Sequence, residues 1–313
     1  MGKIFTYASR VLTVALCVIT LGAANFAGAQ SQPSGQNNPT PKKKKLPTGA
    51  RGFEQFAGRD ASEKLVTGGA TRGECKTYEQ LIECGEGAYE LGEFKQAVDA
   101  FTKAAAMKPE VFTPQYRLGA SYEALGDYPK SAEAYKRAVA LKLDEEKDSP
   151  NDLLIAYYNL GNVLAAANQQ QEAIMTYQQL ISRLPSLSTP HYNLGLSYVA
   201  LAEQKEAAKA TKEAEDARAA AIKAFEEAIK AKPDYWEAHY NMGLVYSKTE
   251  QYPKAVEAFR KTLSLNPDYA PARYNLGLVY FFLDDRKALA EEHKALQAMK
   301  PELAMELAKL MGQ

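Results

Sequence analysis

The chain has 313 residues, of which 46% are hydrophobic and 24% are charged, and its 38 Lys and Arg balance 38 Asp and Glu. This length fits two domains or one elongated domain. The zero net charge argues against a nucleic-acid-binding protein, because contacts with phosphates require a surplus of basic residues.

Residues 1–29 have the three parts of a secretory signal peptide. Lys3 and Arg10 precede an apolar run over 11–24, and small residues follow at 27–29. As a helix the apolar run would be about 21 Å long, which is short for a hydrocarbon core of about 30 Å, although an uncleaved membrane anchor is the alternative. We therefore expect cleavage between Ala29 and Gln30 and export of the protein. The leader and the repeats resemble those of bacterial proteins, and this resemblance favours the periplasm over the extracellular space.

Residues 30–77 form a basic, low-complexity tail that we expect to be mostly disordered. Its first part, 30–47, is composed of Gln, Asn, Ser, Pro and Lys and cannot bury enough apolar surface to fold alone. One run of four lysines is either a solvated linker or a weak contact with an anionic envelope surface, at about 1 kcal/mol per Lys. These are Lys42, Lys43, Lys44 and Lys45.

Cys75 and Cys84 are the two cysteines that remain after the predicted cleavage. An even count in an oxidising compartment is compatible with a disulfide. In one continuous helix the two residues would lie about 13 Å apart, which is too far for a bridge. A disulfide therefore requires the chain to fold back near Thr77, and two free or buried thiols are the alternative.

A pattern of about 34 residues recurs between Tyr78 and Leu303. Each copy contains an apolar residue followed by Gly, and in four copies a Pro stands 24 residues after that Gly. The first copy also has the small and aromatic residues Ala97 and Phe101 in between. The pairs with Gly are Cys84-Gly85, Leu118-Gly119, Leu160-Gly161, Leu194-Gly195, Met242-Gly243 and Leu276-Gly277.

This pattern resembles the tetratricopeptide repeat (TPR) family, in which each repeat of 34 residues forms two antiparallel helices. The resemblance implies an all-α, right-handed superhelical solenoid with a concave inner face. One repeat cannot bury its apolar face alone, so stacked repeats share a core. The resemblance covers residues 78–303 with six repeats, at 78–111, 112–145, 154–187, 188–235, 236–269 and 270–303, and residues 302–313 are expected to form a solvating C-terminal capping helix.

Three departures from the repeat are informative. An insert at 146–153 follows the second repeat, and the fourth repeat is longer than the others because of a charged run over 202–219. That run is rich in helix formers, so we expect a charged rod, which is either inert or a docking arm. The last repeat has Leu289 and His293 at the usual small and aromatic places, which indicates relaxed packing at the end of the stack.

In the family, the first helix of each repeat lines the inner groove, and spacings of three and four put its groove residues on one helical face. Two ladders of side chains occupy this face. An Asn amide can both donate to and accept from a peptide backbone, and Tyr provides rigid contact area, so the ladders predict peptide capture. The alternative is that Tyr and Asn are simply common at these places. The ladder residues are Tyr116, Tyr158, Tyr192, Tyr240 and Tyr274, with Asn159, Asn193, Asn241 and Asn275. Asn162 is a further predicted groove residue, which matches one Asn of the family's carboxylate-clamp variety.

Several acidic side chains on the same face favour a neutral or basic peptide, and His191 and His239 occupy a place that is typical of packing rather than of metal binding. We predict a non-enzymatic interaction scaffold of the cell envelope, without cofactor or metal, that binds a protein or peptide in its groove. The alternative is a structural assembly or tethering subunit that acts through the basic tail and the long fourth repeat. The sequence does not indicate an oligomeric state.

Overall fold

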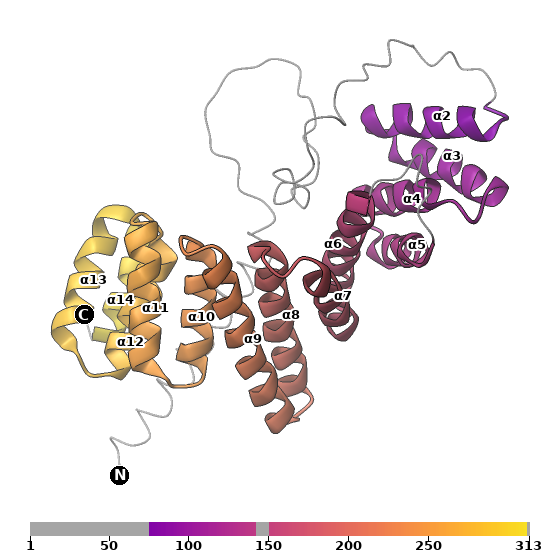
Figure 1. Ribbon diagram of the computed structural model, residues 1–313. Coiled ribbons are helices and arrows are strands. Elements are labelled where there is room, and N and C mark those ends of the chain that lie inside the picture. Colours follow the sequence, from indigo (N-terminus) through magenta and orange to yellow (C-terminus); the bar gives the residue numbers. More distant parts are fainter. Residues whose placement is uncertain (1–74, 142–149, 312–313) are drawn as a thin grey trace. The chain divides into compact units, whose positions relative to one another are not determined.

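The computed structural model describes residues 75–141 and 150–311 (Figure 1). Within these ranges the regular elements are thirteen α-helices, which confirms the all-α repeat architecture. The predicted signal peptide with its cleavage site at Ala29 and Gln30, and the tail up to residue 74 with Lys42, Lys43, Lys44 and Lys45, lie outside the described residues.

The described chain forms two compact units, residues 75–217 and 218–311, and each is described by itself. Within each unit consecutive helices pack against one another. The first unit contains α2 (Tyr78–Glu90), α3 (Phe94–Met107), α4 (Phe112–Leu125), α5 (Tyr128–Ala140), α6 (Pro150–Ala166), α7 (Gln170–Arg183) and α8 (Ser188–Ala207). The second contains α10 (Trp236–Lys248), α11 (Tyr252–Leu265), α12 (Ala270–Phe282), α13 (Arg286–Met299) and α14 (Pro301–Met311), and α9 (Thr211–Ala231) crosses the boundary.

The first helix of every repeat ends in the same turn. One residue adopts the left-handed conformation, and the N–H of the next residue donates to a carbonyl in the last turn of the helix, as Asp127 does to Tyr122 at 2.9 Å. This is the Schellman arrangement, which satisfies the last carbonyls of a helix and reverses the chain. The left-handed residues are Gly92, Gly126, Asn168, Lys209, Glu250 and Asp284.

The two helices of a repeat approach closely at the glycine of the first helix. A Cβ atom on Gly119 would lie 2.7 Å from the ring of Tyr135 in the second helix, and one on Gly243 would lie 2.8 Å from the ring of Phe259. The absence of a side chain therefore lets an aromatic ring rest directly on the backbone of the first helix. Gly85 and Gly161 have the same contact, with Phe101 and Tyr177.

The last repeat replaces this ring with a residue from the C-terminal helix. His293 stands at the aromatic place, and the side chain of Leu307 from α14 covers Gly277 instead, with its Cδ2 at 2.6 Å from the position of a Cβ. Leu307 and Ala304 are fully buried. The predicted C-terminal capping helix is present as α14, most of whose residues keep solvent exposure. The expectation of relaxed packing at the end of the stack was wrong, because α14 supplies the packing that the last repeat lacks.

Both insertions take a form that the sequence did not predict. The last residues of the insert at 146–153 are helical, because α6 begins at Pro150. The charged run of the fourth repeat is not one rod, since a turn at Ala208–Ala210, with Lys209 in the left-handed conformation, divides it. The extra residues lengthen α8 and α9 to 20 and 21 residues.

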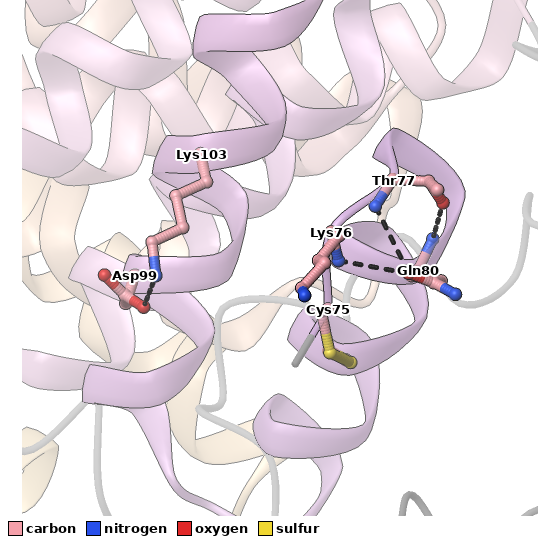
Figure 2. The surroundings of a disulfide bond; sticks show 7 residues. Cys75, Lys76, Thr77, Gln80, Asp99 and Lys103 are labelled. Atoms are coloured by element: carbon pink, nitrogen blue, oxygen red, sulfur yellow. Dashed lines mark hydrogen bonds and ion pairs between the residues drawn. A yellow bond between two sulfur atoms is a disulfide. The ribbon is translucent and has the colours of Figure 1, made fainter. Parts of the chain in front are cut away.

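Cys75 and Cys84 form a disulfide, with their Cα atoms 6.8 Å apart (Figure 2). The chain turns at Thr77, the N-cap of α2, whose side chain accepts from the N–H of Gln80 while the Gln80 side chain accepts from the N–H of Thr77. This capping box fixes the point at which the chain folds back. It thereby brings Cys75 beside the second turn of α2, the geometry that a bridge over nine residues requires.

We expect the substitution Gly126→Ala to destabilise the protein by about 1–2 kcal/mol, because its φ of 77° is strained for any residue with a Cβ. The control is Gly87→Ala inside α2, which should stabilise the protein by about 1 kcal/mol through its helix propensity. A Cβ at either position would contact nothing within 4 Å, so backbone conformation is the variable. Urea unfolding followed by circular dichroism measures both effects, and a destabilisation of equal size in both variants would contradict this explanation.

Reduction of the disulfide should lower the unfolding free energy of the first repeat by roughly 2–3 kcal/mol, since the bridge closes a short loop in the unfolded chain. Thermal unfolding and limited proteolysis with and without reductant measure the loss. The Cys75→Ala/Cys84→Ala variant should be insensitive to reductant. Two free thiols in the protein purified without reductant would show that the bridge does not form.

Candidate functional site

The predicted groove residues all lie in first helices, on α4, α6 and α8 in the unit 75–217 and on α10 and α12 in the unit 218–311. Four of the Asn residues follow a Tyr directly in the helix, so the two ladders run beside each other, and Asn162 follows Gly161. Each predicted residue therefore lies on the first helix of a repeat, but the Tyr and Asn ladders differ in burial and in hydrogen bonding.

Four of the five tyrosines are buried rather than exposed. Tyr192 is 9% exposed and Tyr240 is 2% exposed, and Tyr158 and Tyr274 are buried to a similar degree. The ring of Tyr240 packs on Phe259 with the ring centroids 5.8 Å apart. The expectation that the Tyr ladder offers contact area was therefore wrong for these four residues, because their rings fill the space between helices.

Tyr116 is the half-buried member of the Tyr ladder. Its ring lies 5.6 Å from that of Tyr135, and burial raises the pKa of Tyr116 to about 12. Burial also raises the pKa of Tyr158, while hydrogen bonds from Asn162 and Asn193 lower it. These hydroxyls therefore remain protonated at neutral pH and act as neutral hydrogen-bonding groups.

Three amides of the Asn ladder link a repeat to the one before it within the same unit. The side-chain amide of Asn159 donates to the hydroxyl of Tyr116 at 3.4 Å, and that of Asn275 donates to Tyr240 at 3.0 Å. Asn193 contacts the Tyr158 hydroxyl at 3.5 Å. The donor end of these amides thus holds the stack together, and Asn275, which is 3% exposed, is wholly structural.

Asn159, Asn162 and Asn193 form a half-buried polar cluster on α6 and α8. The Oδ1 atom of Asn162 accepts from Asn193 at 2.9 Å and from the Tyr177 hydroxyl at 2.6 Å. No hydrogen bond from a described residue reaches the amide oxygen of Asn159 or Asn193. This amide cluster therefore presents acceptors that could receive the N–H groups of an extended peptide.

Glu123 on α4 is a half-buried carboxylate in the unit 75–217. Burial raises the pKa of its carboxyl, and the hydroxyl of Tyr135, which donates to it at 3.1 Å, lowers it in part. The neighbouring Arg117 pairs instead with Glu86 at 2.9 Å. Among the described residues, the neutral Tyr135 hydroxyl is thus the one hydrogen-bonding partner of the Glu123 side chain.

In the unit 218–311, the predicted groove residue Tyr240 belongs to a second group with Trp236 and Tyr269, two residues that the sequence did not single out. Trp236 and Tyr269 have their ring centroids 4.6 Å apart, and the ring of Tyr240 meets that of Tyr269 at 5.0 Å. Glu237 lies next to Trp236 in the first turn of α10, and burial raises the pKa of its carboxyl. The signal that could have pointed to this group is Trp236 itself, the single Trp of the chain.

The two His residues at the same place of consecutive repeats are packing residues. His191 is buried and its Nε2 atom lies 2.9 Å from the carbonyl oxygen of Pro185, and His239 is buried as well. In the described part of the chain, no three His, Cys, Asp or Glu residues are grouped as metal ligands would be. None of the helices in that part combines the length and apolar character needed to span a membrane.

Comparison with known families gives matches in both units. Family models described as tetratricopeptide repeat match residues 110–186 and 236–269, and a model described as TPR repeat matches residues 219–250. These matches bear out the resemblance on which the repeat boundaries were based.

The similar curated proteins match over about a third of this chain. The peroxisomal targeting signal receptor of Kluyveromyces lactis is 29% identical over 116 residues, which cover 37% of this chain and 19% of the receptor. The photosystem I assembly protein Ycf3 of Rippkaea orientalis is 31% identical over 100 residues, which cover 32% of this chain and 55% of that protein. The chain thus spans about a fifth of the receptor and about half of Ycf3.

Two solved structures are similar in fold. The crystal structure of MamA protein has a TM-score of 0.51 and 25% identity, and the match covers 62% of this chain and 94% of that one. The structure of YrrB, described as a TPR protein with an unusual peptide-binding site, has a TM-score of 0.51 and 21% identity, with 68% and 100% covered. Both support the helical repeat fold.

The substitution Glu123→Gln should stabilise the protein at neutral pH, because an ionised carboxylate with a raised pKa makes the folded state less stable and Gln can still accept from Tyr135. The sign of the pH dependence follows. The folded protein holds this proton more tightly than the unfolded chain, so the gain should be full above the folded pKa and should vanish below the ordinary Glu value of 4.5.

Thermal unfolding of the unaltered protein and of the Glu123→Gln variant tests this expectation, with about one measurement per pH unit between pH 4 and pH 8. The control is Glu133→Gln, which removes an exposed carboxylate that pairs with Arg137 on α5. A gain at neutral pH that persists unchanged in acid would rule out the titration of Glu123 as its cause.

Proposed function

We infer that this chain is a member of the tetratricopeptide repeat family. We propose that it is a non-enzymatic scaffold, which binds a peptide or protein partner along the face formed by the first helices of its repeats. Proteins built from this repeat are typically interaction modules. The similar proteins include one that is named as a receptor for a targeting signal and one that is named as an assembly protein, and both names describe contacts with other proteins.

The observation that carries the proposal is the amide cluster Asn159, Asn162 and Asn193. Its donors are used within the stack, which fixes the orientation of the amides, and the oxygens of Asn159 and Asn193 receive no hydrogen bond from a described residue. Pre-oriented acceptors cost little entropy on binding. An extended peptide could donate its backbone N–H groups to them whatever its sequence.

We also propose that the protein is exported, with the periplasm as its compartment. The predicted leader at 1–29 supports export, and the disulfide Cys75–Cys84 supports an oxidising environment, because such bridges persist outside the cytosol.

The alternative function is a structural assembly or tethering subunit. The lengthened pair α8 and α9 favours it, because the residues around the turn at Ala208–Ala210 are charged and exposed and no packing need of the repeat explains them. The basic tail with Lys42, Lys43, Lys44 and Lys45 would provide the second contact, with an anionic surface.

The decisive variant is Ala166→Arg, since Ala166 lies four residues after Asn162 and seven after Asn159, on the same helical face. A bulky charge there should obstruct a peptide on the amide cluster without removing any of its hydrogen bonds. We expect capture of a partner from an envelope extract by residues 30–313, and at least about tenfold weaker capture by the variant, which corresponds to about 1.4 kcal/mol.

The matched control is Ala106→Arg, which adds the same side chain at an exposed site of the second helix α3. It should capture the partner as the unaltered protein does, and all three proteins should have the same helical circular dichroism. Equal capture by all three would contradict groove binding. Loss of capture on deletion of residues 30–70 would then favour the tethering function.

A further inference from the structure

Glu237 is a half-buried carboxylate without a counter-ion. No described residue forms an ion pair with it, although it lies in the first turn of α10 among titratable neighbours. The cation that acts on it, Lys232, forms no ion pair with it and stacks on the ring of Tyr235 at 4.9 Å. A carboxylate in such a place is costly to bury unless a cation reaches it.

Two partly exposed aromatic residues lie near this carboxylate, Trp236 as its neighbour in the chain and Tyr269 within its electrostatic reach. Trp236 and Tyr269 are both half-buried, so each keeps part of its ring accessible, and their centroids are 4.6 Å apart. Tyr240 is buried beneath them, hydrogen-bonded to Tyr269, and is held in turn by the amide of Asn275 at 3.0 Å. Because Tyr240 and Asn275 hold Tyr269 in place, the half-buried rings of Trp236 and Tyr269 form a preorganised surface.

The carboxylate and the rings act on one another electrostatically. The charge of Glu237 adds to burial in raising the pKa of Tyr269, which places the two groups within electrostatic reach. Burial and, to a smaller extent, the charge of Asp234 raise the pKa of Glu237, and its own backbone N–H and the charge of Lys232 lower it in part. A negative group and the negative faces of two rings thus create one local potential that a cation would neutralise.

We propose that Trp236, Glu237 and Tyr269 bind a cationic side chain, Lys or Arg, of a peptide partner. The ammonium or guanidinium group pairs with the Glu237 carboxylate and lies over the ring of Trp236, the aromatic residue that binds cations best. This inference rests on the proposed function and deepens it, since it states the chemistry of the partner.

Within the unit 218–311, the site shares the helical face of Asn241. Asn241 stands four residues after Glu237, one turn along α10, and its amide donates to the Glu237 carbonyl at 2.8 Å. Glu237 and Asn241 therefore share one helical face, as residues of that spacing do. A peptide bound along this face would pass the Glu237 carboxylate, and a basic residue of the peptide would form a favourable ion pair with it.

Trp236 is the single Trp of the chain, so tryptophan fluorescence of the protein reports on this site alone. The probe is an acetylated and amidated peptide of alternating Gly and Lys, titrated into residues 30–313. Peptides with Gln or Glu in place of Lys serve as comparisons. We expect a saturable change in emission with the Lys peptide and none with the Glu peptide.

The substitution Glu237→Gln should weaken binding of the Lys peptide by about tenfold or more, because it removes the charge and keeps the shape. The matched control is Glu257→Gln on the second helix α11, where an exposed carboxylate is removed with the same change in net charge. This control should bind as the unaltered protein does. Tyr269→Leu should also weaken binding while the helical circular dichroism is retained.

Equal affinity of Glu237→Gln and the unaltered protein for the Lys peptide would overturn the proposal, and so would equal affinity for the Lys and Gln peptides. Either result would leave capture on the amide cluster untouched, because that cluster lies in the other unit and is tested with Ala166→Arg. If capture from the extract fails while the Lys peptide binds, the peptide-binding face is confined to the unit 218–311.

Discussion

The contact between an aromatic ring and a glycine backbone is the constraint on which the stack depends. With no Cβ on Gly119, the ring of Tyr135 lies directly against the first helix, and the two helices pack more closely than side chains would allow. The end of the chain shows how strict this need is. Where the repeat has His293 instead of an aromatic ring, a separate helix brings Leu307 to cover Gly277.

This close packing explains why the two ladders have different roles. Tyr240 is drawn into the space beside Phe259 and is lost as a contact surface, but its hydroxyl accepts from Asn275 of the next repeat. The same hydrogen bond therefore links repeats and orients the amide. In α6 and α8 the amides are less buried, and the oxygens of Asn159 and Asn193 are the acceptors to which the proposed function assigns peptide binding.

Two carboxylates with raised pKa values illustrate different solutions to the burial of charge. Glu123 receives a hydrogen bond from Tyr135, so its cost is partly met within the fold. Glu237 receives no such bond from a described side chain and lies beside Trp236 and Tyr269, whose ring faces favour cations. The burial of Glu123 therefore affects the stability of the fold, whereas the surroundings of Glu237 favour a cationic ligand. The difference lies in the neighbours of each carboxylate, since both occupy first helices.

The sequence by itself determined the helical repeat, because glycine, small and aromatic residues at fixed spacing encode helix pairs locally, and the first helices at Phe112 and Ala270 begin where that spacing places them. It also determined which helix face carries the Tyr and Asn residues. Only the tertiary structure decided which of these are buried, whether Cys75 and Cys84 meet, and that Trp236 and Tyr269 lie together. The physical reason is that contacts between helices depend on side-chain volumes and rotamers contributed by separate segments, which no local periodicity contains.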